Sequence, residues 1–332
     1  MTVFLLAISF IIILAGCEGF TNGIEWFGKK RGLGERAVGN ILAAVGTALP
    51  ETVVPLVAIL LTGNSHGKEI GIGAILGAPF MLSTLAMFVS GSALLVFRLR
   101  KGRPLHPAVD HKLLGRDLSF FLVLYLMAVA AGLLHQRALN LALVPLLMLC
   151  YAVYAVVILK TEGDLEGETR ALYFHSNHLP ASPHLRRIVL QIIVSLAAII
   201  IGARLFVYAI DGIAGYLGLS ALLMSLLITP VATELPEKFN SVLWIRSGKD
   251  ALALGNITGA MVFQSTFPVS VGLILTDWRL SGVPLVSALL ALGAAGLLLA
   301  WTQLMKKVAW WMLLLGGLWY AAFIIYAIVA TV

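Results

Sequence analysis

Charged residues are scarce in this chain of 332 residues: 12% are Asp, Glu, Lys or Arg, whereas 60% are hydrophobic. A soluble domain carries about 25% charged residues, so the composition excludes a soluble globular protein and most classes of soluble enzyme. The apolar runs are also longer and more continuous than the alternating strands of a transmembrane barrel. The sequence therefore predicts an all-α polytopic membrane protein.

Cysteine is rarer still, with only Cys17 and Cys150, both in apolar stretches. They cannot build a disulfide framework, and no His/Cys spacing of the zinc type is present. The apolar runs also lack an HExxH motif or a Ser/His/Asp set, because all 7 histidines lie in connections or at their edges. We therefore expect no enzymatic activity and no bound cofactor, and a fold held together by helix packing in lipid.

Ten apolar stretches are long enough to form membrane-spanning helices. They lie near residues 3–20, 37–62, 69–97, 117–134, 140–160, 187–215, 219–246, 250–275, 283–302 and 308–331. The first ends in a Leu-Ala-Gly-Cys sequence at Cys17 that is similar to a lipoprotein cleavage box. No basic residue precedes it, so we expect this span to be retained.

The basic residues orient these spans. Most of the 23 lie in the connections that face the cytoplasm if the N-terminus is outside; the exceptions are Lys68, Arg137, Arg279, Arg204 and Lys238. The positive-inside rule thus predicts ten spans with both termini outside, in a plasma membrane of the prokaryotic type. Because the net charge of +7 is distributed over connections, we expect the lipid bilayer and small inorganic cations as partners, and no nucleic acid.

One long polar segment, residues 161–186, separates two five-span units at residues 1–160 and 187–332. It contains His175, His178 and His184. A regulatory metal site on these histidines is one interpretation, and a solvated cytoplasmic linker with incidental histidines is the other. We favour the linker.

The two units repeat each other. Leu-Pro-Glu at residues 49–51 recurs at 235–237, and the same offset of 186 places Glu18 on Arg204. An offset of 182 places residues 73–84 on 255–266. Because each unit has an odd number of spans, the second copy inserts upside down, as in many secondary transporters with a binding site at the membrane midplane. The sequence thus predicts two inverted five-helix repeats.

The repeated motif combines proline with a carboxylate. Pro50 and Pro236 remove backbone donors in mid-helix and should loosen the helix just before them, which frees carbonyl oxygens. Glu51 and Glu237 follow at once, and ionisable groups at membrane depth normally mark an ion pathway. Two carboxylates with several carbonyls resemble the oxygen cage that Ca²⁺ prefers. Two proline kinks with incidental glutamates are the simpler alternative, but that coincidence would have to occur twice in register.

Small residues accompany the motif in both halves. Gly73 and Gly77, and again Gly255 and Gly259, are spaced four apart and so lie on one helix face. This spacing allows the backbones of neighbouring helices to pack closely. It is common in membrane helices, so its position after each motif matters more than its presence.

At these residues the chain resembles the cation/Ca²⁺ antiporter superfamily, and specifically its sodium/calcium exchanger-like members, over nearly its whole length. The family motif G-T-S-L-P-E is similar to residues 46–51 and 232–237. A second family motif, G-N-x-x-G-S-N-x-F-N, is similar to residues 255–264 and more distantly to 73–82.

The resemblance implies a Ca²⁺ site made by Glu51, Glu237 and the backbone oxygens of Thr47 and Thr233. The family's flanking Na⁺ ligands are replaced, because their positions hold Ala48, Glu234, Ala78, Ala260, Leu82 and Gln264. Exchange of Na⁺ for Ca²⁺ in the usual manner is therefore in question. A carboxylate can exchange a proton without further ligands, which favours H⁺ as the counter-ion.

Several ionisable or polar residues are candidate modulators: Glu234, Lys238, Gln264, Glu18 and Arg204. Glu234 and Lys238 stand four residues apart in the favourable acid-to-base order, so Lys238 either neutralises Glu234 or competes with the substrate beside Glu237. Glu18 and Arg204 occupy equivalent repeat positions, so they either form an ion pair near the two-fold axis or snorkel separately.

The leading interpretation is a secondary antiporter that moves Ca²⁺ or another divalent cation in exchange for H⁺ or Na⁺ by alternating access, in which the resemblance implies sliding of the first and sixth spans. The alternative is a non-transporting membrane scaffold or regulator with a degenerate ion site.

Overall fold

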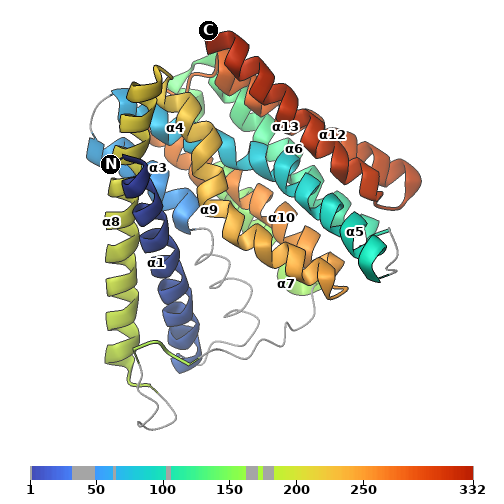
Figure 1. The fold of residues 1–332 in the computed structure, drawn as a ribbon, viewed down its shortest axis with the longest axis horizontal. Helices are drawn as coiled ribbons and strands as arrows, with labels where there is room; N and C mark the ends of the chain where they lie inside the picture. The colour runs from blue at the N-terminus through green and yellow to red at the C-terminus, as the bar shows by residue number, and fades with distance from the viewer. Residues whose placement is uncertain are drawn as a thin grey trace.

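The computed structural model describes residues 2–31, 49–62, 65–101, 106–161, 171–174 and 183–331 (Figure 1). Regular structure within these ranges is entirely helical, as predicted. The elements are α1 (Thr2–Lys30), α3 (Leu49–Thr62), α4 (Ser65–Met81), the π-helical turn η2 (Leu82–Ala86), α5 (Met87–Lys101), α6 (His111–Leu134), α7 (Arg137–Thr161), α8 (Leu185–Leu217), α9 (Ala221–Arg246), α10 (Asp250–Gln264), α11 (Phe267–Leu275), α12 (Gly282–Met305) and α13 (Trp310–Thr331).

Within the described residues, eight helical segments are long and apolar enough to cross a membrane, which establishes an integral membrane protein. The expected span 37–62 is described only as α3, because residues 37–48 lie outside the described part. The expected span 219–246 is α9, whose apolar part is Ala221–Val231. The sequence of α9 becomes polar after Val231 because the motif begins there. The count of ten spans therefore stays a prediction.

Helices α1 and α8 form a pair at one side of the bundle (Figure 1). They pack closely because glycines replace larger side chains at their crossing. A Cβ added to Gly16 would lie 2.8 Å from Cγ1 of Ile199, and one added to Gly202 would lie 2.8 Å from Cγ1 of Ile13. Each residue of the first contact is 186 positions from its counterpart in the second. The same contact is thus made twice, with the helices antiparallel.

A short piece of the linker docks on this pair. Asn22 donates to the carbonyl of Ala171 (3.3 Å), and the amide of Phe174 donates to Oε1 of Gln191 (3.0 Å). Gln191 also donates to Asn22 Oδ1 at 2.9 Å. Because Leu172 is buried as well, residues 171–174 are held to both helices. His175 and His178 lie outside the described residues, and His184 is the N-cap residue of α8.

The first glycine pair packs α4 against α9, as its spacing predicted. A Cβ added to Gly73 would collide with the carbonyl oxygen of Leu222, and one added to Gly77 would collide with that of Leu226. The second pair, on α10, does not repeat this contact within the described residues.

Two long spans are interrupted at positions that the repeat makes equivalent. One interruption is η2 (Leu82–Ala86), and the other separates α10 from α11. At each, a threonine hydroxyl donates to a carbonyl of the preceding turn: Thr84 to Phe80 at 2.5 Å, and Thr266 to Phe263 at 2.7 Å. Such side-chain bonds compete with the helical ladder, and π-helical turns are frequent at functional sites.

The loosened helix expected before Pro236 is not a helix break. Helix α9 runs as one α-helix from Ala221 to Arg246, through Ala232 and Thr233. The proline still removes its own N–H donor, but the helix continues past it. In the first half, residues 46 and 47 lie outside the described part. The expected loosening therefore does not take the form of a break in α9. The break in helical structure falls one span later, between α10 and α11.

The contact between α4 and α9 yields a stability prediction. Gly77→Ala is expected to destabilise the protein by about 1–3 kcal/mol, because the added methyl group meets backbone that cannot rotate away. Gly215→Ala on α8 is the control, since a Cβ there meets nothing within 4 Å and alanine favours the helix. Thermal unfolding in detergent measures both variants. Equal unfolding midpoints for the two variants would show that the contact between α4 and α9 can accommodate a methyl group.

Candidate functional site

Glu51 is the first residue of the candidate site that the structure places. It lies in the first turn of α3 and is 6% exposed. Helix α3 packs against α4, α8 and α11 and also touches α9, which carries the second motif. The structure thus buries the first motif carboxylate within the bundle, at a depth where it needs protein groups or a cation to balance its charge. Thr47 lies outside the described residues.

The second motif lies on α9, where a line of hydroxyl groups leads to Thr233. Ser225, Thr229 and Thr233 recur every four residues and are all buried. Ser225 donates to the carbonyl of Ile70 on α4 (2.7 Å) and lies 2.9 Å from the Thr229 hydroxyl. Thr233 donates to the carbonyl of Thr229 (3.1 Å). This line of hydroxyls on α9 faces α4 at its start and reaches the motif at its end.

Glu234 is paired with Gln264 rather than exposed to solvent. Its side chain is 1% exposed, and its Oε1 accepts a hydrogen bond from Nε2 of Gln264 on α10. The other amide atom, Oε1 of Gln264, is buried and has no partner among the described residues. The side chains of Glu237 and Lys238 lie outside the described part, so a pair between Glu234 and Lys238 stays a prediction.

These groups are oxygen donors, which suit a hard cation. The described residues hold no group of three or more His, Cys, Asp or Glu side chains that could bind a metal. The proposed ligand set would not form such a group, because it contains only two carboxylates, Glu51 and Glu237, and takes backbone oxygens from two threonines. What the structure brings together directly is Glu234 and Gln264, at the contact of α9 with α10, and Thr233 precedes Glu234 in the chain.

Glu18 and Arg204 are not joined in the described contacts. Glu18 accepts a hydrogen bond from the Tyr173 hydroxyl at 2.7 Å, and Arg204 is exposed on α8. The contacts of Gly16 with Ile199 and of Gly202 with Ile13 set the antiparallel register. In that register Glu18 is level with residue 197, about 10 Å along the axis from Arg204. Of the two alternatives, the structure supports separate positions.

A buried carboxylate on α6, Asp117, was not among the residues predicted from the sequence. Asp117 is 5% exposed and accepts hydrogen bonds from Arg116 Nε (2.9 Å) and from the Thr258 hydroxyl on α10 (2.9 Å). It is the first residue of the expected span 117–134, and no motif marks it in the sequence. The four-residue spacing of Ser225, Thr229 and Thr233 could have been read from the sequence.

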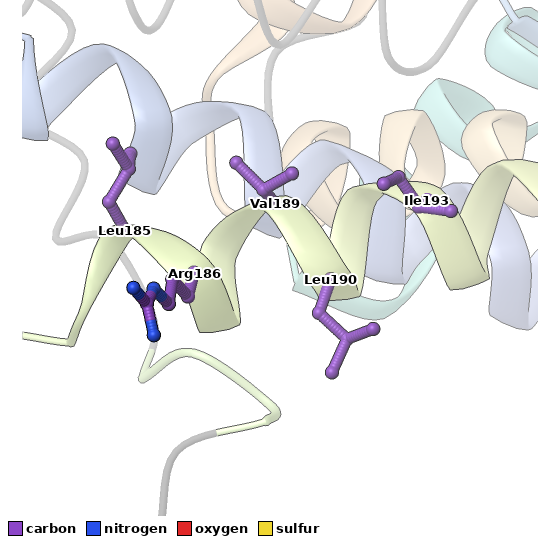
Figure 2. A pocket seen from close by; sticks show the side chains of 5 residues that line it. All are labelled: Leu185, Arg186, Val189, Leu190 and Ile193. Carbon is purple, nitrogen blue, oxygen red and sulfur yellow. The ribbon is translucent and has the colours of Figure 1, made fainter.

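A shallow hollow lies on the outer face of α8, away from these groups. It is lined by Leu185, Arg186, Val189, Leu190 and Ile193, all from the first turns of that one helix (Figure 2). The chemistry described above lies instead on α3, α9 and α10. We therefore place the candidate site inside the bundle and not at this hollow.

The matches to known proteins agree with this architecture. Residues 1–160 and 187–329 match the family described as "Sodium/calcium exchanger protein". The match covers most of the chain, so the chain belongs to this family of membrane transport proteins.

Two relatives and two solved structures illustrate the match. The chain is 23% identical to the putative antiporter CaxA of Alkalimonas amylolytica, over 82% of this chain and 80% of that protein. It is 24% identical to the sodium/calcium exchanger MaX1 of Methanosarcina acetivorans, over 78% and 80%. The fold is similar to the crystal structure of the H⁺/Ca²⁺ exchanger CAX (TM-score 0.76, 16% identity, 99% and 84% covered). It is also similar to the sodium-calcium exchanger NCX_Mj (TM-score 0.58, 19% identity, 98% of both chains).

The pair of Glu234 and Gln264 can be tested by a double-mutant cycle. Gln264→Leu is expected to cost about 1.5–3 kcal/mol, because a hydrogen bond to a charged group is lost. Glu234→Leu combined with Gln264→Leu should cost less than the sum of the single changes. Thermal unfolding in detergent measures all three, with Gln303→Leu, exposed on α12, as the control. Strictly additive losses would show that the two side chains do not act as a pair.

Proposed function

We propose that the chain is a secondary antiporter that moves Ca²⁺ or another divalent cation across the membrane in exchange for H⁺ or Na⁺. The observation that carries this proposal is the buried carboxylate of Glu51 in a motif that the sequence repeats at Glu237. Two such carboxylates offset the large cost of dehydrating a divalent cation. Thr233 and Thr47 supply backbone oxygens in this proposal. The named relatives are antiporters or exchangers, which disfavours the alternative of a non-transporting scaffold.

The proposed architecture is two inverted five-helix repeats, residues 1–160 and 187–332, joined by the linker 161–186. Two observations support it. The contact between glycine and isoleucine that joins α1 to α8 occurs twice with equivalent residues. The interruptions at η2 and between α10 and α11 also fall at equivalent positions. The distribution of basic residues supports both termini outside. The proposed location is a plasma membrane of the prokaryotic type.

Alternating access is the proposed mechanism. Helix α1 packs mainly on α8, and together they lie at one side of the bundle (Figure 1). The glycine contacts join α1 to α8, so the two helices can move as one body. Sliding of this pair against α3 and α9 would open the site to one side of the membrane and then to the other.

Proton coupling is the proposed form of the exchange. The positions where the family carries further oxygen ligands hold apolar side chains at Ala48, Ala78, Ala260 and Leu82. Leu82 is fully buried in η2, and Gln264 already donates to Glu234. A carboxylate can release its proton when it binds the cation, and it needs no further oxygen ligands to take the proton up again.

The carboxylates can be tested directly. Glu51→Gln and Glu237→Gln are each expected to reduce Ca²⁺ flux in proteoliposomes to the background of empty vesicles and to remove Ca²⁺-dependent thermal stabilisation. The reason is that each change removes one charge needed for a divalent ion. Glu69→Gln, in the first turns of α4, is the same change outside the site and should transport normally. Near-wild-type flux in either site variant, with normal elution on size exclusion, would refute the site.

Coupling needs a separate measurement. A proton gradient across the vesicle membrane is expected to drive Ca²⁺ in the direction opposite to proton flow. The reason is that the missing oxygen ligands weaken Na⁺ binding more than they weaken proton binding. Vesicles with a Na⁺ gradient and clamped pH should show little Ca²⁺ uptake. Robust uptake under that second condition would contradict proton coupling while leaving the antiporter proposal intact.

A further inference from the structure

Helix α10 lies between a helix that carries no motif and the helix that carries the second motif. On one side the Thr258 hydroxyl donates to Oδ2 of Asp117 on α6 at 2.9 Å. On the other side Gln264 donates to Glu234 on α9. The two α10 residues are six positions apart, about 9 Å along the axis and on different faces. A continuous line of contacts therefore runs from α6 through α10 to the residue beside Thr233.

The carboxylate of Asp117 is an expensive group to place there. A charged side chain inside a membrane bundle costs several kcal/mol unless it is paired, in order-of-magnitude terms. Arg116 approaches Oδ1 with both Nε and Nη2 at 2.9 Å, which offsets this cost. Oδ2 is then available to bind the Thr258 hydroxyl on α10. Helix packing alone would not require a charge at this position.

Two further contacts hold the same interrupted span. At its start, the amide of Ala108 donates to Oδ2 of Asp250 at 2.9 Å. At its end, Arg137 donates to the carbonyls of Leu273 (2.6 Å), Ile274 (2.5 Å) and Thr276 (3.1 Å), which close α11. The equivalent span α4–η2–α5 packs through Gly73 and Gly77 on α9 instead. The two interrupted spans are thus held in different ways.

We propose that Asp117 is a positioning residue for the cation site. By binding Thr258, it fixes the rotation and height of α10, and α10 in turn sets Gln264 against Glu234 beside Thr233. The interrupted span α10–α11 then forms a side of the site that does not move, because hydrogen bonds hold it to α6, to α7 and to the connection before α6. The transport readout of this inference rests on the proposed antiport function, whereas its exchange readout does not.

The test uses the threonine side of the contact, where isosteric variants exist. Thr258→Val removes the hydroxyl at nearly constant volume, and Thr258→Ser keeps it. Thr302→Val on α12 is the matched control, because Thr302 is equally buried but donates only to Leu298 of its own helix (2.7 Å). Asp117→Asn completes the set. All variants are compared as full-length protein in proteoliposomes and in detergent.

Thr258→Val and Asp117→Asn are expected to raise the Ca²⁺ concentration for half-maximal transport about tenfold, the equivalent of one charge-assisted hydrogen bond. Maximal rates should change little. Hydrogen–deuterium exchange should become faster in residues 253–264 of α10 and stay unchanged in residues 69–81 of α4. Thr258→Ser and Thr302→Val should match the wild type in both measurements.

An unchanged half-maximal concentration and unchanged exchange in Thr258→Val would overturn the inference. Equal effects of Thr258→Val and Thr302→Val would also overturn it, since they would reflect loss of a buried threonine and not of the Asp117 contact. If Asp117→Asn fails to fold, the serine and valine variants decide. If the wild type shows no Ca²⁺ flux, the proposed function fails, and the exchange of α10 still supports or overturns the positioning role.

Discussion

Hydrocarbon offers no hydrogen bonds, so a carboxylate inside this bundle must be held by protein groups, and that requirement ties the helices together. Asp117 binds α6 to α10, and Glu234 binds α9 to α10. At the ends of the spans, Asp211 lies 2.9 Å from His66, and Asp250 holds the connection before α6. These contacts act between helices rather than within them. The acidic residues, few as they are, therefore contribute to the arrangement of the helices as well as to the candidate site.

Close backbone approach is the second constraint on the helices, and it acts at glycine. Glycines admit α8 against α1 and α9 against α4, and Gly316 of α13 admits the carbonyl of Thr84 in η2. In membranes such packing replaces the hydrophobic driving force that soluble helices use. The candidate site lies where both constraints meet, on α9, which is packed by glycine on one side and held by a carboxylate on the other.

The sequence was sufficient for the class of fold and for the position of the motifs, because long apolar runs and a repeated Leu-Pro-Glu do not depend on tertiary context. It was not sufficient for contacts that depend on register. Glu18 and Arg204 are equivalent by the repeat, but the crossing of α1 with α8 keeps them about seven residues apart along the axis. Pro236 was expected to loosen its helix, and α9 nevertheless continues through it as one element. Asp117 was not predicted, because only the packing of α10 on α6 reveals its partner Thr258.

The docking of residues 171–174 on α1 and α8 provides a site where a probe can be attached to this helix pair. The backbone amide of Phe174 is held by Gln191, while its side chain is 42% exposed. The four-residue piece belongs to the connection between the two halves, yet it is fastened to both helices of the pair. A fluorophore or spin label attached at position 174 would therefore travel with that pair and would report its displacement without entering the path of the ion.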